Sequence, residues 1–264
     1  MKSKFALLLL LSLILLTGFA CQASGPVGNL FASPTPTVTI TPSSTPTLTP
    51  SPTATVTPSP TPLPTGVHFE DQSNGDIQII DYDGGYSLLL SDDWISVPAS
   101  ADALKEAIKN VSKDNPELAE SLKNMDEVIG NDTLRLISFN TQKEYRDGTT
   151  YPNLVVITLE DSVIKSVPLI FLVDVNVEQI KSGGGRATVL DSGTDKNANA
   201  VEYGYIYLDN QIKQGPRIVK VRQNVIIIKV DSSMTLLTLT IPNGTKDKAE
   251  PLLKSLIDSI SLLK

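Results

Sequence analysis

The sequence offers few residues that could carry out nucleophilic or metal chemistry. It contains one histidine, His68, and one cysteine, Cys21. A Ser-His-Asp triad needs a positioned histidine, and a multi-histidine zinc site needs several. His68 lies at the edge of a Thr- and Pro-rich stretch, where little would hold it in place. We therefore predict a protein without catalytic residues of these kinds, without a metal site and without a cofactor.

Three loop sequences have the composition of ligand loops but not their spacing. Residues 183–186 (Gly-Gly-Gly-Arg) follow a predicted helix, whereas phosphate-binding glycines precede a helix N-terminus. Residues 195–199 (Asp-Lys-Asn-Ala-Asn) alternate oxygen-bearing side chains but lack the glycine and the glutamate of a calcium loop. We interpret the first as a helix stop, the second as a polar hairpin loop, and residues 81–84 as a turn.

Aromatic residues provide the main candidate binding surface. Tyr203, Tyr205 and Tyr207 alternate along one predicted strand, so they share one face, with Gly204 and Ile206 on the other. Together with Trp94 they could line a ligand groove. The alternative is a half-exposed sheet face without a ligand. If a groove exists, we expect it on the tyrosine side of this strand.

The 29 acidic residues leave one enzymatic route open. Two carboxylates that face each other across a cleft can hydrolyse a glycosidic bond. Their separation in space does not follow from sequence. A carboxylate-dependent hydrolase of cell-envelope glycans is therefore the alternative to a non-catalytic protein.

The N-terminus has the pattern of an export signal that ends at Cys21. Lys2 and Lys4 precede an apolar run over residues 5–16, shorter than the roughly 20 residues of a spanning helix. With cleavage after Ala20, residues 1–20 form a signal peptide that resembles the bacterial lipoprotein signal. That resemblance implies a diacylglyceryl anchor on Cys21, with its fatty chains, at the outer face of the cell membrane. Residues 18–20 also fit an ordinary cleavage site, which would give a secreted protein.

A spacer separates the anchor from the folded part. Residues 21–66 contain a tract, residues 33–65, rich in Thr, Pro and Ser and without charged or aromatic residues. Such a segment cannot bury enough apolar surface to fold, so we predict a disordered linker. Removing Lys2 and Lys4 with the signal leaves 20 basic and 29 acidic residues, a net charge of −9. This balance argues against nucleic-acid binding.

Residues 67–264 have the patterns of one α+β domain. The patterns predict strands over residues 77–80, 86–90, 134–140, 154–159, 187–190, 200–208, 217–230 and 235–241, with a hairpin at residues 81–85 and a bulge near Asn224. They predict helices after Ser100, after Asn115, over residues 168–181, and from about residue 247 to the C-terminus. We expect a single antiparallel sheet with helices packed on its faces.

The opening of this domain resembles the PsbP and Mog1 superfamily, including DcrB-type bacterial lipoproteins. The motif is Gly-Tyr-Ser-Leu-Leu-Leu at residues 85–90 with Trp94 four residues on, and residues 256–260 resemble the closing helix. The resemblance implies an α/β/α sandwich with a helical insertion at about residues 100–125. Its members are mostly binding or accessory modules, among them an extrinsic subunit of photosystem II and a Ran-binding protein. No ligand residue of theirs maps onto this chain.

These patterns favour a non-catalytic accessory or binding module held outside the cell by lipid on Cys21. Its partner would be a protein or an envelope component. The alternatives are the glycan hydrolase and an extrinsic accessory subunit of the photosystem II type.

Overall fold

The structure is a computed structural model that describes residues 64–263, apart from residues 114, 124–132, 184–185 and 215–216. The predicted signal peptide, the predicted lipidation site Cys21 and nearly all of the predicted linker lie outside the described residues. The same holds for the C-terminal end of the predicted second helix around Met125.

The strands are β1 (Val67–Asp71), β2 (Ile77–Asp81), β3 (Tyr86–Leu90), β4 (Trp94–Pro98), β5 (Leu134–Asn140), β6 (Asn153–Glu160), β7 (Thr188–Lys196), β8 (Glu202–Gln214), β9 (Arg217–Val230), β10 (Ser233–Pro242) and β11 (Ser261–Leu262). The α-helices are α2 (Ala101–Val111), α3 (Pro116–Lys123), α4 (Leu169–Ser182) and α5 (Glu250–Ser259). Short 3₁₀ turns are η1 (Lys143–Tyr145), η2 (Ile164–Ser166) and η3 (Asn243–Thr245).

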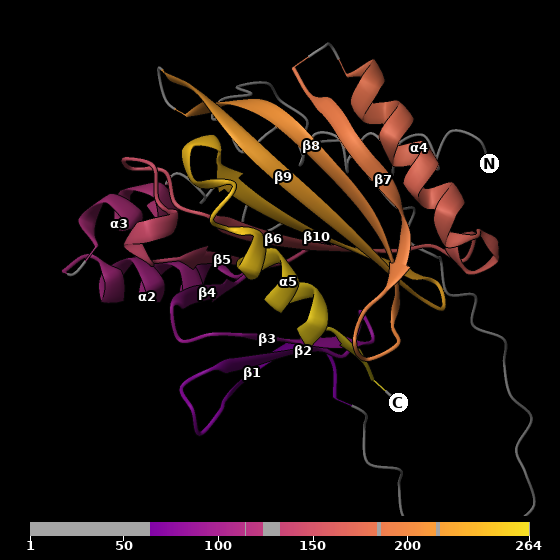
Figure 1. Ribbon diagram of the computed structural model, residues 1–264. Coiled ribbons are helices and arrows are strands. Elements are labelled where there is room, and N and C mark those ends of the chain that lie inside the picture. The colour runs from indigo at the N-terminus through magenta and orange to yellow at the C-terminus, as the bar shows by residue number, and fades with distance from the viewer. Residues whose placement is uncertain (1–63, 114, 124–132, 184–185, 215–216, 264) are drawn as a thin grey trace, which may run out of the picture. The chain divides into compact units, whose positions relative to one another are not determined.

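The strands form two antiparallel sheets (Figure 1). The large sheet has seven strands in the order β4-β5-β6-β10-β9-β8-β7, and the small sheet has four in the order β1-β2-β3-β11. The α+β class with an antiparallel sheet and packed helices is confirmed. The expectation of a single sheet is corrected, because the hairpin at residues 81–85 pairs with β1 and β11 instead of joining the large sheet.

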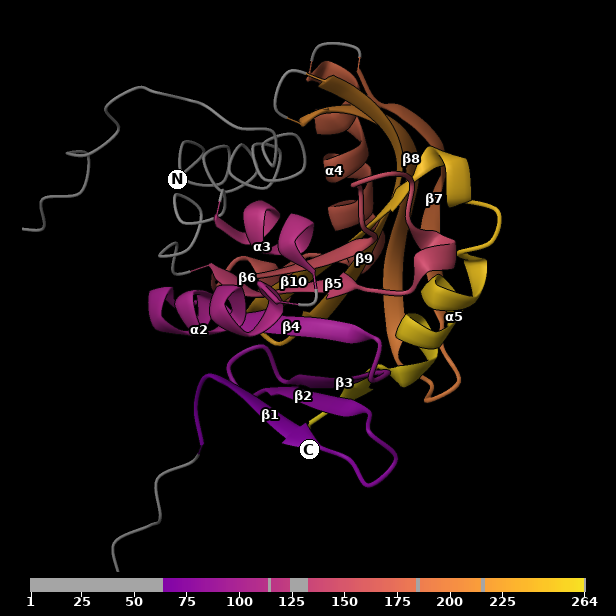
Figure 2. The same ribbon diagram turned by 90° about the vertical axis from the view of Figure 1, so that its left-hand side faces the viewer.

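The large sheet separates two apolar cores. Helices α2, α3 and α4 cover one face, while the small sheet and α5 cover the other (Figure 2). The sequence of β9 explains why both faces of the sheet are covered. Val225 and Ile227 point into the core under the helices α2 to α4, and Ile226 and Ile228 point into the core under α5. A strand that is apolar on both faces must be buried on both. The parts of the large sheet that remain accessible to a partner are therefore its ends and edges.

Several local predictions are confirmed. The hairpin β2–β3 forms across residues 82–85. Ser100 caps α2 by accepting a hydrogen bond from the Ala103 backbone N–H, and Pro116 opens α3. Helix α4 forms over the segment predicted as a helix at residues 168–181. None of the helices in the described range has both the length and the apolarity needed to cross a bilayer.

Several predicted element boundaries and one predicted bulge were wrong. Strand β7 continues to Lys196 instead of ending at Leu190, because an exposed edge strand tolerates the polar residues that suggested a turn. The bulge expected near Asn224 is absent, since β9 pairs in continuous register there. Register shifts lie instead between Val189 and Asp191 and between Leu134 and Leu136. Helix α5 begins at Glu250, not near residue 247, and ends at Ser259, after which β11 pairs with β3.

Candidate functional site

The three tyrosines predicted to form a binding face do share one side of β8. Ile206, between them, is fully buried in the core on the opposite side. Gly204 also faces that side, where an added Cβ would approach the Val173 side chain of α4 to 2.5 Å. A side chain at position 204 would therefore force α4 away from the sheet. The tyrosines consequently lie on the α5 side of the large sheet.

The tyrosines differ in exposure. Tyr203 is 6% exposed and belongs to the core, whereas Tyr205 and Tyr207 are partly exposed at its margin. The rings of Tyr205 and Tyr207 stack with their centroids 4.9 Å apart and their planes 30° apart. The ring centroids of Tyr203 and Tyr205 are 6.5 Å apart. The predicted face is thus anchored in the core at Tyr203 and accessible at the other two rings.

The edge strand β7 adds two carboxylates to this face. Asp191 lies directly opposite Tyr207, Gly193 opposite Tyr205, and Asp195 opposite Tyr203. Residues directly opposite in an antiparallel pair point to the same side of the sheet. Both aspartates are exposed. We call Tyr205, Tyr207, Asp191 and Asp195 the tyrosine face.

Gly193 makes room for this arrangement. A Cβ at this position would lie 3.0 Å from the Tyr205 hydroxyl oxygen and 3.2 Å from the ring carbon that bears it. The Tyr205 ring therefore extends across β7 over a position without a side chain. Any larger residue at position 193 would push the ring away from the edge of the sheet.

The environment of the tyrosines favours their neutral form. Burial, followed by the neighbouring tyrosines and the charges of Asp191 and Asp195, raises the pKa of Tyr207 to about 12. Burial and then the carboxylates of Asp195 and Asp258 raise the pKa of Tyr203 as well. At neutral pH the face therefore presents uncharged rings beside negative carboxylates.

An alkaline titration tests this description of Tyr207. Because its pKa is raised in the folded state, its contribution to stability is complete below its ordinary pKa of 10 and is lost as pH rises toward about 12. Tyr207→Phe should therefore lose less stability than the wild type over this pH range. The measurement is the thermal midpoint as a function of pH, with tyrosinate absorbance recorded in parallel. Equal alkaline losses in both proteins would contradict it.

This geometry suits a cationic group. Aromatic faces attract lysine, arginine or alkylammonium cations, and carboxylates at their side add charge attraction. Sequence reasoning found the tyrosines but missed Asp191, Gly193 and Asp195. These three residues alternate in the sequence as the tyrosines do. That alternation identifies them only if the strand is known to continue past Leu190 and its register with β8 is known.

The other residues considered as site candidates in the sequence lie away from the tyrosine face. Trp94 is 5% exposed within the core under the small sheet, so it does not line the tyrosine face. His68 is exposed, with its Nε2 2.9 Å from the Thr65 carbonyl oxygen. Gly183 follows the last residue of α4, as predicted for a helix stop. Among the described residues, no three His, Cys, Asp or Glu side chains group as metal ligands.

Of residues 195–199, predicted to form a polar hairpin loop, the first two belong to β7, and the loop that follows them contacts the end of α5. The Asn197 amide nitrogen donates to the carbonyl oxygens of Ile257 and Ile260, both at 2.8 Å. The Asn199 amide nitrogen donates to the carbonyl oxygens of Asp258 and Ile260, both at 3.0 Å. These amides are committed to the C-terminal end of the helix. Residues 81 and 83, in the predicted turn, are committed to Arg135.

Comparisons with known proteins give likeness of fold only. No protein family matches the chain, and no curated protein sequence matches it. Among solved structures, the chain is similar to cyanobacterial PsbP from Synechocystis, with 12% identity, 72% of this chain and 94% of that chain covered, and a TM-score of 0.46.

Two further structures are similar. The Ran-binding protein Mog1p of Saccharomyces cerevisiae has 13% identity, covers 73% of this chain and 97% of its own, and has a TM-score of 0.41. LpqN of Mycobacterium tuberculosis, involved in cell envelope biogenesis, has 11% identity and a TM-score of 0.40. The match covers 68% of this chain and 83% of LpqN. Scores below 0.5 carry no functional argument.

Proposed function

We propose that this chain is a non-catalytic binding module, exported and held by lipid on Cys21 at the outer face of a membrane. Its tyrosine face binds a basic segment of a protein or envelope partner. The lipid anchor and the spacer rest on the sequence pattern of residues 1–66. The binding role rests on the tyrosine face and is in keeping with the superfamily that the sequence resembles.

The observation that carries the proposal is the stacked, accessible ring pair beside two carboxylates. Tyr205 and Tyr207 lie at the margin of the core, and exposed Asp191 and Asp195 flank them on the neighbouring strand. Tyrosines lose little conformational entropy on binding and often dominate interface energetics. Their anchoring through Tyr203 keeps the rings ordered before a partner arrives, which lowers the entropic cost of binding.

The direct test measures binding of a short lysine-rich peptide to the mature chain by calorimetry. We expect the double variant Tyr205→Ala/Tyr207→Ala to weaken binding at least about tenfold, because both aromatic contacts are lost. Asp191→Asn/Asp195→Asn should weaken binding and reduce its dependence on salt. Tyr82→Ala, in the β2–β3 turn, is the matched control and should bind as the wild type does.

The same variants identify the partner on intact cells. Crosslinking should capture a stable partner with the wild type and the Tyr82→Ala control but not with the double variant. Cys21→Ser should abolish detergent-phase partitioning while the purified chain still binds the peptide. Equal binding of a glutamate-rich peptide of the same length would sink the proposed surface. Saturable release of glycan fragments by the purified chain would favour a hydrolase instead.

A further inference from the structure

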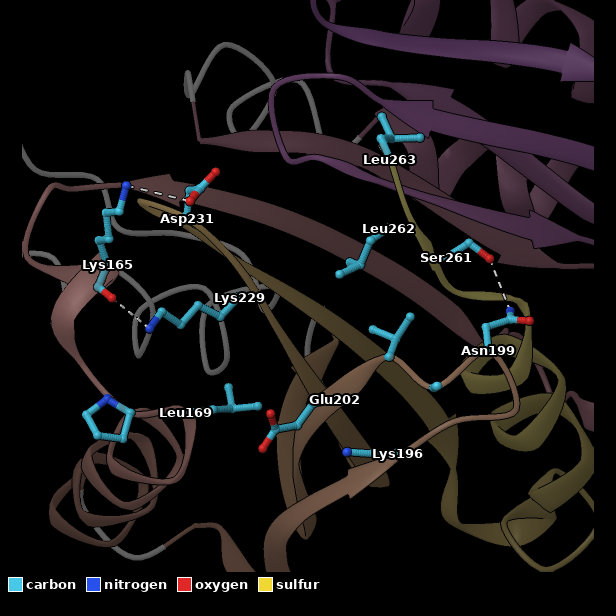
Figure 3. A pocket seen from close by; sticks show the side chains of 13 residues that line it. Lys165, Leu169, Lys196, Asn199, Glu202, Lys229, Asp231, Ser261, Leu262 and Leu263 are labelled. Atoms are coloured by element: carbon cyan, nitrogen blue, oxygen red, sulfur yellow. Dashed lines mark hydrogen bonds and ion pairs between the residues drawn. The ribbon is translucent and has the colours of Figure 1, made fainter.

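A pocket lies at one end of the large sheet and involves four segments that are distant in sequence (Figure 3). These are the connection from η2 to α4, the β7–β8 loop, the β9–β10 turn and the C-terminal residues 261–263. Its volume is about 1060 Å³, at the upper end of the roughly 300–1,000 Å³ typical of small-molecule sites. Neither the tyrosine face nor the proposed function uses it.

Apolar side chains form much of the pocket lining. Leu169 comes from the first turn of α4, Val201 from the β7–β8 loop directly before β8, and Leu262 from β11. Leu262 is 43% exposed, and its side chain projects into the space between the four segments (Figure 3). A large apolar side chain at the wall of a pocket is available to a ligand. This part of the pocket suits a hydrocarbon chain.

Lysines bring positive charge to the same pocket. Lys165, Lys196 and Lys229 line it together with the two carboxylates of Glu202 and Asp231, an excess of one positive charge. This excess is local, because the chain as a whole has a net charge of −7. The local positive excess therefore favours an anionic group in the pocket.

Lys229 reaches the backbone of Lys165 near the beginning of α4, and the Lys165 side chain extends toward Asp231 (Figure 3). The Lys229 ammonium donates to the carbonyl oxygen of Lys165 at 3.1 Å (Figure 3) and to that of Val167 at 2.6 Å. An ammonium has three donors, so one remains for a ligand. The Lys165 ammonium lies 3.8 Å from an Asp231 carboxylate oxygen at the exposed rim. The first turn of α4 contains no acidic residue that would repel an anion.

The backbone of two turns in the pocket lining is fixed by its own contacts. Ala200 and Asp231, both in the pocket lining, are the two non-glycine residues of the described chain with positive φ, at 60° and 48°. Such a conformation persists when surrounding contacts fix it. Here the Ala200 N–H bonds to the Asn197 carbonyl oxygen, and Asn197 is itself bonded to the end of α5. The pocket is thus preformed.

We infer that this pocket binds a single-chain amphiphile with an anionic head group. The head group lies against Lys165 and Lys229 at the beginning of α4, and the hydrocarbon chain lies along Leu169, Val201 and Leu262. A free phosphate would gain only the charge contacts, and a cationic amphiphile only the apolar ones. Tight binding requires both in one molecule.

Calorimetry on the mature chain tests the inference with three probes below their micellar concentrations: decyl phosphate, decyltrimethylammonium and inorganic phosphate. We expect decyl phosphate to bind at least about tenfold more tightly than each of the others, since each lacks one of the two contributions. Similar affinity for decyltrimethylammonium would overturn the inference, as would the absence of decyl phosphate binding. Binding of inorganic phosphate at the same affinity would point to a simple anion site and also overturn it.

Matched leucine variants locate the site. Leu262→Asp places a negative charge inside the pocket and should weaken decyl phosphate binding at least about tenfold. Leu190→Asp makes the same change at a leucine that is 48% exposed on β7 and does not line the pocket, so it should bind as the wild type does. Both leucines are exposed enough for folding to survive, which the thermal midpoint verifies. If Leu262→Asp and Leu190→Asp changed the affinity for decyl phosphate equally, the binding site could not be this pocket. Tyr205→Ala/Tyr207→Ala should leave this binding unchanged, which separates it from the peptide test.

Discussion

Replacing Arg135 with methionine is expected to lower the free energy of unfolding by about 3–5 kcal/mol, because it leaves a buried carboxylate without its counter-charge. That carboxylate belongs to Asp81, whose side chain is 0% exposed. The Arg135 Nε donates to Asp81 Oδ2 at 3.0 Å, and its Nη2 donates to Oδ1 at 2.8 Å. Hydrogen bonding to Asp81 is also the main cause that raises the pKa of Arg135.

The ion pair joins the two sheets. Asp81 ends β2 in the small sheet, and Arg135 lies on β5 in the large sheet. Asp81 also accepts a hydrogen bond from the Gly84 backbone N–H at 2.9 Å, which closes the β2–β3 hairpin around it. Loss of the arginine therefore affects both the packing of the sheets and the turn. We expect the small sheet to separate from the large one at lower denaturant concentration.

Urea unfolding of the mature chain measures the effect. Arg222→Met is the matched control: Arg222 Nε lies 2.7 Å from Asp209 Oδ1, but both side chains are more exposed, at 28% and 41%. Exposed ion pairs contribute about 0–1 kcal/mol, so this variant should remain within about 1 kcal/mol of the wild type. In the double variant Asp81→Asn/Arg135→Met the loss should be smaller than the sum of the two single losses, because no unpaired charge remains. A loss for Arg135→Met no larger than for the control would refute the role assigned to this pair.

Signals that depend on neighbours in sequence predicted much of the fold. The Ser100 cap, Pro116 at the start of α3 and the glycine after α4 act within one helical turn, and each has the expected outcome. The same is true of the β2–β3 hairpin, which depends on one tight turn. These features follow from local backbone and side-chain chemistry, so a single sequence is enough to find them.

Features that depend on register or on distant contacts could not be predicted. The pairing of Asp81 with Arg135 spans 54 residues, and that of Asn197 with Ile257 spans 60. In the tyrosine face, Asp191 and Asp195 lie beside the tyrosines only because β7 pairs with β8 in one particular register, which the sequence does not specify. Polar edge residues in β7 resembled a turn, since alternation of apolar side chains is weak on an exposed edge. The pocket near Leu262 needed four separate segments.

Asn197→Asp is expected to lower the free energy of unfolding at neutral pH by about 2–5 kcal/mol, because it removes two buried hydrogen-bond donors and introduces a charge. Asn197 is 8% exposed and makes all four hydrogen bonds that an amide readily makes. Its oxygen accepts from the N–H groups of Asn199 and Val201, and its nitrogen donates to the carbonyl oxygens of Ile257 and Ile260. Aspartate keeps the two acceptor interactions and loses both donors.

The charge introduced by Asn197→Asp lies next to the C-terminal end of α5. The carboxylate introduced at position 197 would face two carbonyl oxygens at the C-terminal end of α5, where the helix dipole is also negative. Protonation would restore one donor and remove the charge. The pKa of the introduced carboxyl group should therefore be raised in the folded state, so the stability of the variant recovers relative to the wild type as the pH is lowered through that pKa.

Chemical denaturation at several pH values between neutral and mildly acidic tests this expectation. Gln211→Glu makes the same amide-to-carboxylate change at an exposed residue of β8, and should shift stability by less than about 0.5 kcal/mol. Asn197→Ala should also be destabilising but without the recovery at lower pH, since it introduces no titrating group. If Asn197→Asp lost as little as Gln211→Glu, or if its deficit did not shrink on acidification, the β7–β8 loop would not be what holds the end of α5.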